Sequence, residues 1–332
     1  MKQILLSILM LVCVMGIKAQ DAMVATLQSG EQSLVFYGAN GLVDAVNVAS
    51  TGDLITLSAG TFNTTTINKS LRIQGAGYLD DPGKGVYRTV LNADLRIELA
   101  DGNTDDFLLE SLFSSHALYL QSNVPINRFV LKRCRFRNVY FNNSITDGCQ
   151  IEHCRIGAYL SIGDAAKAFS IVNSVIQNIS RNNSSSSIVY ANTIIHRIDN
   201  SAIATFQNCI LSSNYSSTSS SSKLNENCIV SNCLSLIEKM FENITSPTSC
   251  WYSTRVAVWG VDKGFSETDS YLLTEDAKKQ YIGTDGTEIG INGGIKPFTF
   301  TPSHPQITKR DIATKTSGGK LKVNITVEAQ ND

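Results

Sequence analysis

Six short segments in the middle of the chain superpose without gaps and recur about every 20 residues. They read LKRCRF, IEHCRI, IVNSVI, YANTII, FQNCIL and VSNCLS. Their fourth positions, spaced 20, 20, 19, 16 and 24 residues apart, hold Cys134, Cys154, Ser174, Thr193, Cys209 and Cys233. A repeat of this length indicates a solenoid, in which each repeat is one coil that buries its apolar side against its neighbours.

Each position within the repeat has its own chemistry. Large apolar residues hold the first position and most of the sixth positions, as Leu131 and Phe136 do, and the fourth position is small. We expect equivalent inward residues to stack about 4.8 Å apart, the spacing of neighbouring strands. Strict alternation would put the first and fourth positions on opposite faces, so the chain must bend near the third position.

The third position carries Asn in four of the six repeats. Its occupants are Arg133, His153, Asn173, Asn192, Asn208 and Asn232. Asn tolerates the left-handed backbone conformation of a bend, and its amide can bond along a column of its own kind. Arg133 and His153 in place of Asn indicate that this end of the column differs from the rest.

These segments resemble the right-handed parallel β-helix of the pectin-lyase-like superfamily, whose coils have this length and carry interior stacks of Asn, Ser and Cys. Residues 41–62, GLVDAVNVASTGDLITLSAGTF, resemble its N-terminal signature of a short helix, a Gly-Asp turn and a first strand. Val43, Val46 and Ala49 would form the helix face that caps the core. The resemblance implies an all-β fold: one right-handed parallel β-helix with an N-terminal helical cap and a C-terminal β appendage.

The chain divides into four segments in this prediction. They are a signal peptide (1–19), an N-terminal lead (20–36), the β-helix with an irregular C-terminal flank (37–294), and a linker with a strand tail (295–332). The tail alternates apolar residues at Leu321, Val323, Ile325 and Val327, which is typical of a strand with one buried face. We expect this strand to pair with the solenoid flank or with a second chain.

The N-terminus predicts export. A basic start at Lys2 precedes an apolar run at 4–17 that is too short for a membrane span, and Ala19 provides a small residue before cleavage. The ending Lys18-Ala19-Gln20 resembles signal peptides of Bacteroidetes, and the C-terminal run resembles the ends of exported β-helix proteins from that group. This resemblance implies a secreted, periplasmic or cell-surface protein of a Gram-negative bacterium. No other run is apolar enough to span a membrane.

The net charge of the chain bears on whether it binds nucleic acid. Cleavage before Gln20 leaves 26 Lys and Arg against 29 Asp and Glu, a net charge of −3. A nearly neutral chain of this length argues against a nucleic-acid partner.

The most basic coils offer a candidate ligand site. Lys132 and Arg135 flank an inward cysteine and are therefore expected to point outward, with Arg137 two residues further on and Arg155 directly over Arg135. Two solvated guanidinium groups one rung apart repel by about 1 kcal/mol. Holding them there would suit an acidic ligand such as a uronate. The plainer alternative is that the long side chains simply splay into water.

Catalytic residues are harder to find. In lyases of the superfamily that the chain resembles, an Arg or Lys acts as base and aspartates hold calcium. Here Asp105, Asp106 and Asp147 lie in expected loops, and the GHG and RIK motifs of polygalacturonases are missing. Inverting hydrolysis needs two carboxylates about 6.5–9.5 Å apart, and the repeats offer only Glu152.

Two functions therefore stay open. The first is a non-catalytic β-helix that binds a polysaccharide or a cell-surface glycan, without a cofactor. The alternative is a polysaccharide lyase acting on a uronate-containing glycan, and calcium is expected only in that case. The residues alone assign neither an enzymatic activity nor an oligomeric state to the chain.

No metal site is expected. The pairs with zinc-like spacing are Cys149 with Cys154 and Cys228 with Cys233. If the coils stack as predicted, Cys154 and Cys233 lie about 19 Å apart and cannot share an ion whose ligands sit near 2.3 Å. Cys134 and Cys154 would stack at the strand spacing, beyond the roughly 3.8 Å that disulfide-bonded Cβ atoms prefer, so free thiols are predicted.

Overall fold

The structure is a computed structural model, and it describes most of the chain. The described residues are 23–82, 86–99, 106–122, 124–141, 146–163, 166–180, 187–199, 203–212, 223–300, 305–312, 319–320 and 322–328. The predicted signal peptide, Asp105 and Leu321 lie outside them.

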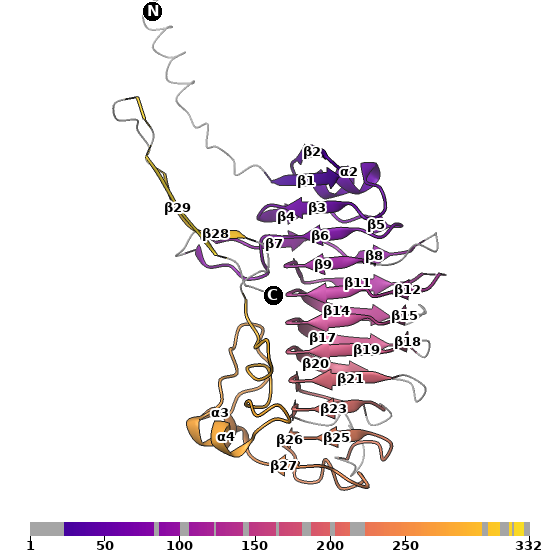
Figure 1. Cartoon of the computed structure of the whole chain (residues 1–332), viewed down its shortest axis with the longest axis vertical. Helices are drawn as coiled ribbons and strands as arrows, with labels where there is room; N and C mark the ends of the chain where they lie inside the picture. The colour runs from indigo at the N-terminus through magenta and orange to yellow at the C-terminus, as the bar shows by residue number, and fades with distance from the viewer. Residues whose placement is uncertain are drawn as a thin grey trace, which may run out of the picture.

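The chain winds into a right-handed parallel β-solenoid of about eight turns (Figure 1). Each coil contributes one strand to each of two long sheets, and consecutive strands of a sheet come from consecutive coils. The predicted fold class is thereby confirmed. None of the described helices is long and apolar enough to cross a membrane.

The first sheet has 11 strands. In spatial order they are β2 (Gln32–Tyr37), β1 (Val24–Ser29), β3 (Leu54–Leu57), β6 (Arg72–Gln74), β9 (Leu108–Glu110), β13 (Val130–Lys132), β16 (Gln150–Glu152), β19 (Phe169–Val172), β21 (Ile188–Ala191), β23 (Thr205–Gln207) and β25 (Ile229–Ser231).

The second sheet has 13 strands, and a third, short sheet closes the coils in the middle of the solenoid. The path of the second sheet is β27 (Trp251–Tyr252), β26 (Leu234–Ser235), β24 (Ile210–Leu211), β22 (Ile194–Ile195), β20 (Val175–Ser180), β17 (Arg155–Ile162), β14 (Arg135–Phe141), β10 (Phe113–Ser114), β7 (Thr89–Leu91) and β4 (Gly60–Phe62). Its side branch is β11 (Ala117–Leu120), β8 (Leu95–Ile97) and β5 (Thr66–Ile67). The third sheet is β12 (Ile126–Asn127), β15 (Thr146–Asp147) and β18 (Ala166–Lys167).

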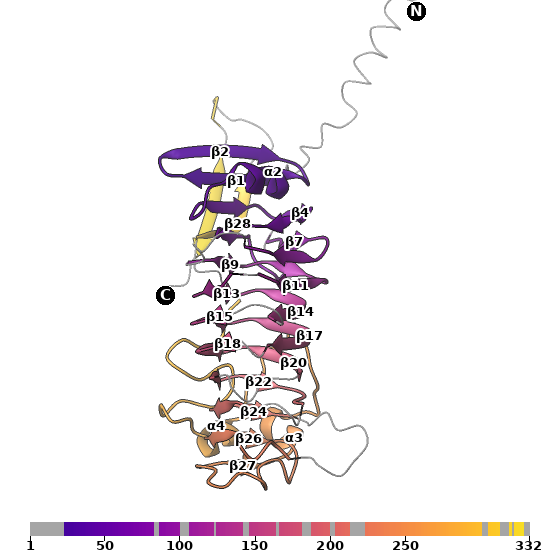
Figure 2. The same ribbon diagram turned by 90° about the vertical axis from the view of Figure 1, so that its right-hand side faces the viewer.

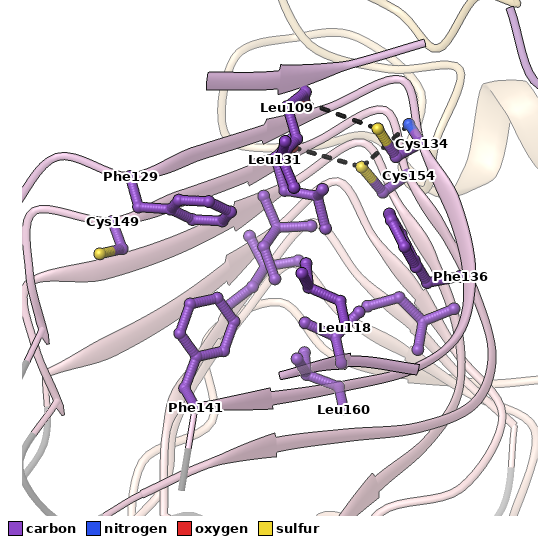
Figure 3. Packing of buried hydrophobic residues seen from close by; sticks show 14 of the residues in the cluster. Leu109, Leu118, Phe129, Leu131, Cys134, Phe136, Phe141, Cys149, Cys154 and Leu160 are labelled. Atoms are coloured by element: carbon purple, nitrogen blue, oxygen red, sulfur yellow. Dashed lines mark hydrogen bonds between the residues drawn. The ribbon is translucent and has the colours of Figure 1, made fainter. Parts of the chain in front are cut away.

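The register places equivalent repeat positions in columns. The first positions pair rung by rung, as Leu131 with Ile151, Ile151 with Ile171, Ile171 with Tyr190, Tyr190 with Phe206 and Phe206 with Val230. Figure 3 shows Leu131 and Phe136 in the interior with the rings of Phe129 and Phe141. All four side chains are almost completely buried.

All six third-position residues have a left-handed backbone, with φ between 45° and 55°. These residues (Arg133, His153, Asn173, Asn192, Asn208 and Asn232) are called the bend column below. Their side chains do not form the expected column in which each Asn amide is hydrogen-bonded to the next Asn. One Asn–Asn contact occurs, from Asn208 Nδ2 to Asn192 Oδ1 at 3.5 Å. The amides of Asn173, Asn208 and Asn232 bond to residues 282–293, because that part of the chain lies along the bend.

The fourth positions form a ladder of buried, free thiols and hydroxyls. The backbone N–H of Cys134 donates to Cys154 Sγ at 3.4 Å, and the N–H of Cys154 donates to Ser174 Oγ at 3.1 Å. The Cys154 thiol donates in turn to the carbonyl of Leu131 at 3.3 Å (Figure 3). Burial raises the pKa of the Cys154 thiol to about 12, so it stays protonated at neutral pH.

The N-terminal end of the solenoid is closed by α2 (Gly41–Val48) and by the antiparallel hairpin of β1 and β2 (Figure 2). The face of α2 toward the core carries Leu42, Ala45 and Val46, followed by Ala49. Val43, which the sequence placed on that face, is only half-buried.

Residues 253–300 run back along the outside of the second sheet and are called the cover segment (Figure 1). It contains the short helices α3 (Arg255–Trp259) and α4 (Glu275–Gln280). Its apolar residues pack on the fifth-position side chains of the last four repeats. The members of this cluster are Val175, Ile194, Ile210 and Leu234 on the solenoid, and Val258, Trp259, Tyr271, Leu273, Ala277, Tyr281, Ile289 and Ile291 on the cover segment.

The cover segment is hydrogen-bonded to the bend column as well. Asn173 Nδ2 donates to the carbonyls of Ile291 at 2.9 Å and Gly293 at 2.8 Å. Asn232 Nδ2 donates to the carbonyl of Ile282 at 2.8 Å. A Cβ on Gly290 (φ 80°) would lie 2.9 Å from the Ile210 side chain, so the glycine allows this close approach.

The tail forms a hairpin of its own. β28 (Gln306–Ile312) pairs antiparallel with β29 (Val323–Glu328). The expected pairing of the terminal strand with the solenoid flank or a second chain is therefore wrong, since β28 supplies its partner. The Val323, Ile325 and Val327 side chains are exposed.

Candidate functional site

The four basic residues of the predicted ligand site do not form one surface. Lys132 lies half-buried on β13, and Arg137 is exposed on β14. Arg135 and Arg155 are adjacent on the second sheet and do point away from the solenoid interior. However, their exposed fractions are only 9% and 0%. The expectation that both side chains face solvent is wrong, because the cover segment lies over them.

Arg155 is enclosed by the cover segment. Its Nη1 donates to the carbonyl of Ser266 at 2.8 Å and its Nη2 to the carbonyl of Asp269 at 2.5 Å. The guanidinium carbon lies 4.8 Å from the Phe298 ring centre and 5.3 Å from that of Phe300. Carbonyl oxygens and aromatic faces both favour a cation, so these groups stabilise the buried charge, and no described carboxylate forms an ion pair with it.

Arg135 is held by three groups. Its Nη2 forms an ion pair with Glu267 of the cover segment, and its Nη1 donates to the carbonyl of Ser114 at 2.6 Å. Its guanidinium carbon is 4.8 Å from the Phe113 ring centre. Together, Arg135 and Arg155 tie residues 266–269 to the second sheet.

The exceptional bend residues have structural partners. Arg133 Nη1 lies 3.1 Å from Glu110 Oε1, and both side chains are almost completely buried. Gln74 Nε2 donates to the other oxygen of Glu110 at 3.0 Å. The His153 ring stacks on Phe298 at 5.9 Å.

His196 is a buried titratable residue that contacts the cover segment. Its Nε2 lies 3.3 Å from the Tyr271 hydroxyl, and its ring meets Phe265 edge-on. Burial, followed by the charges of Arg255, Arg155 and Arg197, lowers the pKa of His196 to about 4.

We expect the free energy of unfolding to fall as pH drops from about 6.5 to about 4. In the unfolded chain His196 binds a proton near pH 6.5, but in the folded chain only near pH 4. The stabilising contribution of neutral His196 is therefore fully present above pH 6.5 and is lost as pH falls to about 4. The free energy of unfolding decreases by about 3 kcal/mol at most over this range. Urea unfolding of wild type and His196→Gln at pH 7 and pH 4.5 measures it. The wild type should lose more stability than the variant; equal losses would contradict the assignment.

A groove of about 610 Å³ opens elsewhere, on the outer side of the first sheet. Arg72 and Arg128 lie on its walls, with Leu108 and Val130 at the sheet. Arg128 Nη2 lies 3.7 Å from Asp106 Oδ1, and both side chains are largely exposed. This groove is not lined by the four predicted basic residues.

The candidate carboxylates are spread over different positions. Asp106 borders that groove, Asp147 is exposed on β15, and Glu152 is half-buried on β16. Among the residues that the structure describes, no group of three or more His, Cys, Asp or Glu side chains is arranged to hold a metal ion.

A surface that the sequence analysis missed lies on the side branch of the second sheet. Tyr119 on β11 and Tyr140 on β14 are register partners, and their rings stack at 5.1 Å with an angle of 22°. The Arg96 guanidinium lies over the other face of Tyr119, 4.6 Å from the ring centre. Tyr159, one rung beyond, is 37% exposed. These four residues are called the tyrosine face.

The stack ends at Tyr140. Its register partner on the next rung is Ser161, which is followed by Ser180, so small side chains continue the column. One face of the Tyr140 ring is therefore not covered by an aromatic register partner. Partial burial and the neighbouring Tyr119 and Tyr159 raise the pKa of Tyr140, which keeps its hydroxyl protonated and able to donate.

Comparison of the chain with protein-family models, with curated proteins and with solved structures gives no match.

Proposed function

We propose that this chain is an exported β-helix protein of the pectin-lyase-like type that binds a polysaccharide or cell-surface glycan on the tyrosine face. The observation that supports this proposal is the half-buried Tyr140 at the end of the Arg96–Tyr119–Tyr140 stack, where the next register partner is the small Ser161 instead of another aromatic residue. One side of a sugar ring presents C–H groups, which pack on aromatic faces, while its hydroxyls bond to polar groups around the ring.

The surroundings of the stack suit an extended chain of sugars. Arg96 Nη1 donates to Gln121 Oε1 at 3.1 Å, and the Asn138 side chain lies on the same outer face as Tyr140. The exposed Arg137 adds a positive charge on this side of the coil, and that charge acts to lower the pKa of Tyr140. Arginine favours carboxylate-bearing units, so uronate-containing polymers are preferred.

Export rests on the N-terminal sequence. A signal peptide cleaved before Gln20 would release the mature chain into the periplasm, to the cell surface or to the medium of a Gram-negative bacterium. Glycans are abundant in all three places. The lyase alternative, with calcium as its cofactor, is distinguished by the products of the same binding experiment.

We expect Tyr140→Ala to weaken glycan binding by about tenfold, since a lost stacking contact is worth roughly 1.4 kcal/mol. Tyr140→Phe, which keeps the ring, should retain most of the affinity. Native affinity electrophoresis against neutral and uronate polymers, with and without calcium, measures it. Tyr252→Ala is the matched control, because Tyr252 is 52% exposed at the far end of the solenoid.

Three results would decide against parts of this proposal. Equal retention of wild type and Tyr140→Ala would move the site away from the tyrosine face. No retention on any polymer would overturn glycan binding itself. Unsaturated products released from a uronate polymer would replace the binding function by the lyase.

A further inference from the structure

The β2 strand leaves one edge of the first sheet open. The N–H of Gly38 donates to the carbonyl of Met23 at 2.8 Å, and hydrogen-bonded pairs alternate along an antiparallel ladder. The even-numbered residues of β2 therefore bond to β1. The main-chain groups of Ser33, Val35 and Tyr37 point away from β1, where the described part of the chain supplies no strand.

The side chains of β2 do not protect this edge. Leu34, Val35 and Tyr37 are exposed by 43%, 47% and 69%. The strand QSLVFY contains neither charge nor proline, the usual devices that prevent edge-to-edge pairing. At the opposite end of the sheet, β25 is covered: the N–H of Thr248 donates to the carbonyl of Val230 at 3.1 Å. The first sheet therefore has a covered edge at β25 and an open edge at β2.

We propose that the β2 edge pairs antiparallel with the β2 edge of a second copy of this chain. A two-fold axis normal to the sheet keeps like faces together, so residues of the same parity stand opposite each other. Centred on Val35, this register places Val35 against Val35, Ser33 against Tyr37 and Leu34 against Phe36. Ser33, Val35 and Tyr37 then exchange their free main-chain hydrogen bonds, and no like charges face each other.

A second copy is a better partner for β2 than an unrelated strand, because in this register the free main-chain groups of the two β2 strands match and their side chains carry no opposing like charges. The symmetric pairing continues the first sheet of one copy into that of the other and joins the solenoids end to end. It also closes after two copies, since each copy offers one such edge. The proposal is independent of glycan binding, because the tyrosine face lies on another sheet.

Cysteine cross-linking tests the register directly. The Cα atoms of a hydrogen-bonded pair lie about 5.5 Å apart, within the range that a disulfide spans. Val35→Cys should therefore form a covalent dimer rapidly under mild oxidation. Ser33→Cys is the matched control, because the two Ser33 residues would lie about 14 Å apart. Wild type, whose half-buried Cys250 is its most exposed described thiol, sets the baseline.

The non-covalent dimer is tested by light scattering after size exclusion and by sedimentation. Wild type should be dimeric, and Val35→Glu should raise the dissociation constant about tenfold or more while leaving the thermal midpoint unchanged. A monomeric wild type with equal cross-linking of Val35→Cys and Ser33→Cys would overturn the proposal. So would a dimer that survives Val35→Glu but is lost on removal of residues 301–332, since the tail would then be the partner.

Discussion

Deletion of residues 253–332 is expected to leave the solenoid insoluble or aggregated. The deletion uncovers a continuous outer strip formed by the fifth-position residues Val175, Ile194, Ile210 and Leu234, all fully buried in the intact chain. Exposed apolar strips on a sheet favour association. The shorter deletion of residues 301–332 keeps the cover segment and should remain soluble.

Size exclusion and binding of a hydrophobic dye compare the two deletions. Dye binding and high-molecular-weight material should appear only when residues 253–300 are absent. A soluble, dye-negative chain ending at residue 252 would show that the cover segment is dispensable and that the apolar strip tolerates water.

Arg155→Ala is expected to lower the free energy of unfolding by about 3–5 kcal/mol. The substitution leaves the carbonyls of Ser266 and Asp269 without their donor and opens a cavity beside Phe298 and Phe300. Chemical denaturation measures the loss, and limited proteolysis should show earlier cleavage within residues 261–270.

Arg137→Ala is the matched control for Arg155→Ala. Arg137 is an exposed arginine in the neighbouring coil, so its loss should change stability by no more than about 0.5 kcal/mol. If Arg155→Ala proved equally harmless, Arg155 would not be a structural tie, and its role as a ligand-binding residue would regain support.

The repeat made the solenoid predictable. The repeat length predicts the coils, and the residue types at each position predict which side chains point inward and where the backbone is left-handed. Leu131 and Ile151, for example, lie in the expected register. The cover segment was not predicted, although a signal existed. Val175, Ile194, Ile210 and Leu234 are apolar at a position that points outward, which indicates a covering element.

The position of Arg135 and Arg155 next to inward cysteines predicts that they point outward and form a surface patch. Their partners show why they are buried instead, since arginine is almost never buried without partners. Those partners lie more than 100 residues away in Glu267, Ser266 and Asp269, and local spacing does not reveal such contacts. For the same reason the left-handed bend of Asn173 was predictable, whereas its bonds to Ile291 and Gly293 were not.

The tyrosine face carried a weak signal in the sequence. Tyr119, Tyr140 and Tyr159 recur at nearly the coil length, so they belong on successive rungs. A register shift between β14 and β17 places Tyr159 beside the column of the other two tyrosines. Only the three-dimensional register therefore separates the stacked pair from its neighbour.

Hydroxyl-radical footprinting of the wild-type protein, with and without a saturating oligosaccharide of the polymer it retains, tests the functional claim most directly. We predict protection of Tyr140 and Tyr159, with Tyr37 and Tyr252 unchanged because they lie near opposite ends of the solenoid. Protection confined to residues 263–269 of the cover segment, or to the groove at Arg72 and Arg128, with Tyr140 fully reactive, would contradict it.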